Sequence, residues 1–151
     1  MIKHWVVAIA LLCCASDLLY AQVDDPNANF GIKPTRSVWS GVYSAAQAQR
    51  GEQWYLLDEC GSCHDEPASG VAMLVGADFL QDWDGQSALA LARHIHSSPM
   101  GTPGDIRLAE ATELIAYILR QNRIPAGSSD LSSDQHALAR IRMDALNPAG
   151  R

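Results

Sequence analysis

The stretch Glu59-Cys60-Gly61-Ser62-Cys63-His64-Asp65 contains two cysteines separated by two residues, and a histidine follows the second cysteine directly. A Cys-x-x-Cys pair alone is weakly informative, because redox dithiols, zinc sites and haem attachment sites all use it. The histidine narrows the choice, since only some of these sites need an imidazole at that place. The rest of the chain decides which chemistry the stretch serves.

The rest of the sequence lacks the features that a zinc site, a redox dithiol or a structural disulfide would need. A zinc site needs about four ligands, but there is no second cysteine pair, and His94, His96 and His136 form no recognisable ligand set. A thioredoxin-like dithiol is typical of a βαβ context, and the sequence has no strand pattern. A disulfide across two intervening residues is strained and holds a fold poorly.

Cys-x-x-Cys-His is the attachment sequence of c-type haem, and the chemistry explains its spacing. Each thiol adds across one haem vinyl group, and a tight turn places the sulfurs of Cys60 and Cys63 along one porphyrin edge. His64 is then carried under the iron as its proximal ligand. The stretch therefore predicts one covalently attached haem c, bound through Cys60, Cys63 and His64.

The first 21 residues have the pattern of a secretory signal peptide. A basic start at Lys3 precedes an apolar run that is too short to span a bilayer, and cleavage is expected after Ala21. An uncleaved membrane anchor is the alternative. Cleavage removes Cys13 and Cys14, so Cys60 and Cys63 would remain as one close pair in an exported, periplasmic protein. Many bacteria attach c-type haem outside the cytoplasm.

The composition indicates one acidic domain. The chain has 151 residues, 48% of them hydrophobic, and a formal net charge of −6. This charge argues against a nucleic-acid partner. Apolar periodicity predicts helices over residues 44–59, 85–97 and 107–123, and a more weakly patterned helix over residues 133–146. The fold class is therefore all-α, with a leader at 22–39, a domain at 40–127 and a tail at 128–151.

Residues 41–127 resemble the class I c-type cytochromes. The resemblance rests on the helix that leads into Cys60-Gly61-Ser62-Cys63-His64, the loop Ser98-Pro99-Met100-Gly101 and the final helix with Tyr117, which follow in the family's order. The stretches 40–48, 76–80 and 83–85 are similar to small periplasmic cytochromes associated with quinoprotein dehydrogenases. The resemblance implies three main helices around one haem, here with a further C-terminal helix.

The resemblance also implies a methionine on the distal side of the iron. Among the four methionines, Met1 lies in the signal peptide, Met143 in the tail, and Met73 soon after the haem motif. Met100 lies in a Pro/Gly loop between two helices and is the expected sixth ligand. His94 and His96, just before this loop, are the competing ligands.

The family's helix crossing has matching residues in this chain. Gly51 and Tyr55 resemble the small and aromatic residues through which the first helix crosses the last, where Tyr117 would meet them. Close helix crossing needs a residue without bulk at the contact. Trp83 is expected either to face the haem or to be an ordinary core residue.

The expected function is that of a one-electron carrier, not an enzyme, because two axial side chains leave the iron no open site. By resemblance, the partners are periplasmic redox proteins: a dehydrogenase as donor and a further cytochrome or a terminal oxidase as acceptor. Two alternatives stay open. One is a haem sensor or haem enzyme with an open distal site, and the other is a fixed cytochrome subunit of a dehydrogenase complex. The leader and tail are expected to be docking segments or disordered linkers.

Overall fold

The computed structural model describes residues 29–57, 60–65, 73–97 and 106–150 of the chain. The described α-helices are α2 (Ala45–Leu57), α3 (Gly61–His64), α4 (Ala77–Asp82), α5 (Ala88–His96), α6 (Leu108–Gln121) and α7 (Gln135–Ala139). The remaining elements are the 3-10 helices η1 (Val38–Ser40) and η3 (Pro148–Gly150) and the strands β1 (Arg36–Ser37) and β2 (Ile141–Arg142). The fold is mostly helical, as expected, and the predicted signal peptide lies outside the described residues.

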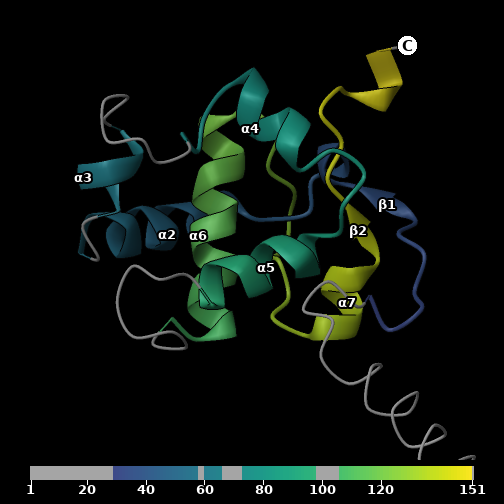
Figure 1. Ribbon diagram of the computed structural model, residues 1–151, viewed down its shortest axis with the longest axis horizontal. Coiled ribbons are helices and arrows are strands. Elements are labelled where there is room, and N and C mark those ends of the chain that lie inside the picture. The colour runs from purple at the N-terminus through teal and green to yellow at the C-terminus, as the bar shows by residue number, and fades with distance from the viewer. Residues whose placement is uncertain (1–28, 58–59, 66–72, 98–105, 151) are drawn as a thin grey trace, which may run out of the picture.

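Helix α6 runs through the middle of the molecule, and both α2 and α5 pack against it (Figure 1). Its apolar residues recur every three or four positions and so form one stripe. The stripe is buried, as its sequence predicted, and consists of Ala111, Leu114, Ile115, Ile118 and Leu119. The helix begins at a capping carboxylate, because Glu110 accepts a hydrogen bond from the backbone N–H of Arg107 at 2.8 Å.

Helix α2 crosses α6 at Gly51, and the contact leaves no room for a side chain. A Cβ atom on Gly51 would lie 1.9 Å from the carbonyl oxygen of Glu113 and 3.0 Å from the Cβ of Tyr117. Next to the crossing, the Glu113 carboxylate accepts hydrogen bonds from Arg50 and from the Trp54 indole, each at 2.7 Å. The small residue expected at this crossing is therefore the one that the packing requires.

The described parts of the leader and the tail belong to the same packed unit as the helices. β1 pairs with β2 in parallel, and the indole of Trp39 donates to the Asp144 carbonyl at 2.8 Å. Met143 is 2% exposed and joins the main hydrophobic core together with Leu138. The described residues of the leader and the tail therefore pack against the same core as the helices between residues 40 and 127.

The tail helix is shorter than its pattern suggested. It spans Gln135–Ala139 instead of residues 133–146, because the chain turns into β2 directly afterwards. Its first turn is capped by Asp134, whose carboxylate accepts from the Ala137 N–H at 2.8 Å. Helix α4 and the strand pair were not expected, since six and two residues are too short to show a period.

Candidate functional site

The cysteine motif lies on the single helical turn α3. The N–H groups of Cys63 and His64 both donate to the Cys60 carbonyl, at 3.3 and 3.0 Å. Residues three and four positions apart share one face of a helix, so the turn brings Cys60, Cys63 and His64 to one side. Cys60 is 8% exposed, whereas Cys63 and His64 are half-buried.

Cys60 and His64 open into a cavity that we call the motif cavity. Its empty volume is about 790 Å³, with the open mouth included. Most of the side chains that line it are aliphatic or aromatic. The lining consists of Tyr55, Cys60, His64, Met73, Leu74, Phe79, Asp82, Trp83, Leu91, His94, Ile95, Ile106, Leu114 and Ile118. Helices α2, α3, α4, α5 and α6 all contribute, so residues far apart in sequence meet here.

The expected sixth ligand lies outside the described residues. Met100 belongs to the segment 98–105, for which the structure gives no placement. The described residues on both sides of this segment, Ile95 and Ile106, line the motif cavity. Cys63 is not among the lining residues, although it belongs to the same turn as Cys60 and His64. The structure therefore brings Cys60 and His64 to the cavity and leaves Met100 unplaced.

The two competing distal histidines differ in their surroundings. His94 lines the motif cavity, and its ring meets the edge of the Trp83 ring with 5.4 Å between centroids. His96 instead lies against the backbone, with Nδ1 2.7 Å from the Ile106 carbonyl oxygen. Trp83, for which two roles were open, also lines the cavity. His94 is thus the competing histidine that reaches the cavity wall.

Tyr55 connects the motif turn to the helix crossing. Its ring packs against that of Tyr117 with 4.9 Å between centroids, as expected for the crossing of α2 and α6. Its hydroxyl donates to the Asp65 carboxylate at 2.9 Å. Burial, aided by this carboxylate, raises the pKa of the Tyr55 hydroxyl well above its ordinary value, so the group keeps its proton. This bond could not be predicted from the sequence, because a tyrosine at the crossing is expected there only for its aromatic ring.

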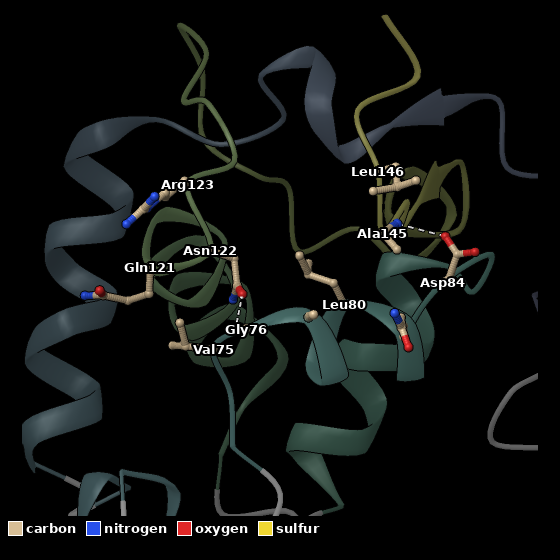
Figure 2. A pocket seen from close by; sticks show the side chains of 11 residues that line it. Val75, Gly76, Leu80, Asp84, Gln121, Asn122, Arg123, Ala145 and Leu146 are labelled. Carbon is tan, nitrogen blue, oxygen red and sulfur yellow. Dashed lines mark hydrogen bonds between the residues drawn. The ribbon is translucent and has the colours of Figure 1, made fainter. Parts of the chain in front are cut away.

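A second cavity, the polar groove, lies beside the segment from Val75 into α4 (Figure 2). It is lined by Val75, Gly76, Ala77, Leu80, Gln81, Asp84, Gln121, Asn122, Arg123, Ala145 and Leu146. Figure 2 shows Asn122 bonded to Gly76 and the Asp84 carboxylate bonded to the backbone of Ala145. No residue of the cysteine motif lines the groove.

Within the described ranges, no group of three or more His, Cys, Asp or Glu side chains is arranged to hold a metal ion. In the same ranges, no helix has the length and apolar character needed to cross a membrane. Comparisons with models of protein families, with curated proteins and with solved structures give no match to this chain.

Proposed function

We propose that this chain is an exported monohaem c-type cytochrome that carries one electron at a time between other redox proteins. The observation that carries the proposal is the motif cavity, where Cys60 and His64 of one helical turn meet mainly apolar walls. A covalently attached haem needs thiol groups, an imidazole ligand and apolar surroundings in one place. The polar groove is lined by neither a thiol nor an imidazole.

The chemistry of the cavity lining supports such a haem. Leu74, Phe79, Leu91, Leu114 and Ile118 supply apolar walls that would exclude water from a flat macrocycle. Cys60 and Cys63 would hold it through thioether bonds, and His64 would bind the iron from the same turn. The haem supplies an iron that alternates between Fe(II) and Fe(III).

Met100 would supply a thioether to the iron as its second side-chain ligand, as the family resemblance implies. The cavity-lining residues Ile95 and Ile106 flank its segment, so the chain leaves from the cavity wall and returns to it. A thioether ligand raises the reduction potential relative to a second imidazole. If His64 and Met100 both bind the iron, they would leave it no open position for substrate, so the proposal is a carrier and not an enzyme. By the family resemblance, its partners are a periplasmic dehydrogenase and a downstream cytochrome or oxidase.

The test is the optical spectrum of the chain exported from a host with a c-type maturation system. We expect a covalent c-type spectrum and, in the ferric state, the weak charge-transfer band of methionine ligation. Met100→Ala should abolish this band, while the control His94→Ala should keep it. A spectrum of the unmodified ferric protein without this band, changed by His94→Ala and not by Met100→Ala, would assign the ligand to His94. Carbon monoxide binding to the reduced unmodified protein would favour a sensor or enzyme, and absence of haem would refute the proposal.

A further inference from the structure

The motif turn is too short to hold its own orientation. Helix α3 has four residues, and an isolated turn of this length has no stability in water. The structure describes only residues 60–65 in this part of the chain. The direction in which His64 points must therefore be set by contacts between this turn and the rest of the molecule.

Tyr55 makes hydrogen bonds with both ends of this turn. Its backbone carbonyl accepts from the N–H of Cys60 at 3.1 Å, at the start of the turn. Its hydroxyl donates to the carboxylate of Asp65 at 2.9 Å, directly after the turn. One residue of α2 thus fixes the first and the last position of the segment that carries the motif.

The turn also packs tightly against the Tyr55 ring. A Cβ atom on Gly61 would lie 2.6 Å from Oδ2 of Asp65 and 3.2 Å from Cε1 of Tyr55. Tyr55 itself is 5% exposed, and its ring packs against the ring of Tyr117. The ring therefore acts as a rigid support for the turn, and α2 and α6 together determine its place.

We propose that Tyr55 is a positioning residue, whose bond to Asp65 fixes the orientation of the His64 imidazole in the motif cavity. The inference rests on the proposed function, because it assigns the imidazole to the iron. Tyr55, Cys60 and His64 line the same cavity, so a movement of the turn against Tyr55 would turn the imidazole relative to the cavity walls. A hydrogen bond to a charged carboxylate is among the stronger bonds available for this purpose.

The test compares Tyr55→Phe and Asp65→Ala, alone and combined, in the exported protein. Tyr55→Phe keeps the ring and removes only the hydroxyl. The matched control is Tyr117→Phe, which removes a hydroxyl that bonds Gln121 and feels the Asp65 carboxylate only through a weaker charge interaction. The first readout is the set of paramagnetically shifted haem methyl resonances of the ferric protein, because their order and spread depend on the plane of the axial imidazole.

We expect Tyr55→Phe and Asp65→Ala to change the methyl pattern alike, and the double variant to add nothing further. Tyr117→Phe should leave the pattern unchanged. The second readout is hydrogen exchange at the amides of His64 and Asp65, whose bonds at 3.0 and 3.1 Å close the turn. Exchange should become about tenfold faster in either single variant, as expected for the loss of one hydrogen bond.

An unchanged methyl pattern and unchanged exchange in Tyr55→Phe would overturn the inference. So would equal effects of Tyr55→Phe and Tyr117→Phe, because they would indicate general loosening of the helix crossing. If the unmodified chain carries no haem, the proposed function fails, but amide exchange still shows whether Tyr55 holds the turn. Failure of the inference and failure of the proposed function are therefore distinguishable.

Discussion

The motif cavity and the polar groove are both lined by residues of the short segment 74–80, but their linings differ in chemistry. Leu74 and Phe79 face the motif cavity, whereas Val75, Ala77 and Leu80 face the groove. The groove is the larger, with an empty volume of about 1290 Å³ against about 790 Å³, open mouths included. Amide, carboxylate and guanidinium side chains line much of the groove, while the motif cavity combines a thiol and an imidazole with apolar walls.

This difference teaches that volume alone does not identify a functional site. A cavity binds a cofactor when a few well-placed polar or ligating groups meet mainly apolar walls. The groove has room but no thiol or imidazole. The motif cavity has both on one turn, next to residues from four other helices. Substitutions in the two cavities should therefore have different consequences.

The largest expected effect is the loss of covalent haem in the double variant Cys60→Ala/Cys63→Ala. Without thiols no thioether bond forms, so no haem should remain on the polypeptide after denaturing electrophoresis and haem staining. Gln81→Ala in the polar groove is the matched control and should keep full staining. Equal loss of haem in the control would mean that both cavities serve the cofactor.

A second large effect is expected from truncating the wall of the motif cavity. Leu114 is 3% exposed, and Leu114→Ala should lower the free energy of unfolding by about 2–5 kcal/mol, because it removes buried apolar surface. Leu146 in the groove is 65% exposed, so Leu146→Ala should change the free energy by less than about 0.5 kcal/mol. Denaturant unfolding of the two variants measures both values. Similar losses would show that another segment covers the groove in solution.

The sequence predicted the helices that carry long apolar periods and missed the elements that depend on distant partners. Helix α6 repeats its apolar residues over Leu108–Gln121, so its buried stripe was visible in the sequence. The pair β1 and β2 has two residues on each strand, and only folding brings Arg36 next to Ile141. Gln47 shows the same limit. It has capping-box spacing after Ser44, but its side chain instead bonds the backbone of Leu131 in the tail.

The candidate site could be predicted in part for similar reasons. Cys60, Cys63 and His64 lie close together in the sequence, so their spacing predicts haem attachment. The cavity walls come from residues such as Phe79, Leu91 and Ile106, which carry no local signal. The bond between Tyr55 and Asp65 also depends on the folded turn, because ten positions separate these residues along the chain.

Asn122 holds the segment that lines both cavities, and a substitution there tests how much its hydrogen bonds stabilise this segment. Its amide nitrogen donates to the carbonyls of Leu74 and Ile118, and its amide oxygen accepts from the Gly76 N–H, each at 2.9 Å. Asn122→Ala removes three hydrogen bonds of a buried side chain, so we expect a loss of about 1–3 kcal/mol in the free energy of unfolding. Hydrogen exchange at Gly76 should accelerate. Gln121→Ala, at the exposed neighbour, should change neither the free energy of unfolding nor the exchange at Gly76. Equal effects of the two substitutions would show that the Asn122 hydrogen bonds do not hold this segment.

The smallest expected effect is a gain in stability at Arg123, on the edge of the polar groove. Arg123 follows the C-cap of α6 with φ 60°, a left-handed conformation that glycine adopts without strain. Arg123→Gly should therefore raise the free energy of unfolding by about 0.5–1 kcal/mol, after the greater freedom of the unfolded chain is subtracted. Arg123→Ala is the control, since it removes the guanidinium but keeps the strained backbone, and it should give no gain. Denaturant midpoints distinguish the two. An equal gain in both variants would show that the charge at the groove, and not the backbone, limits stability on this side of the molecule.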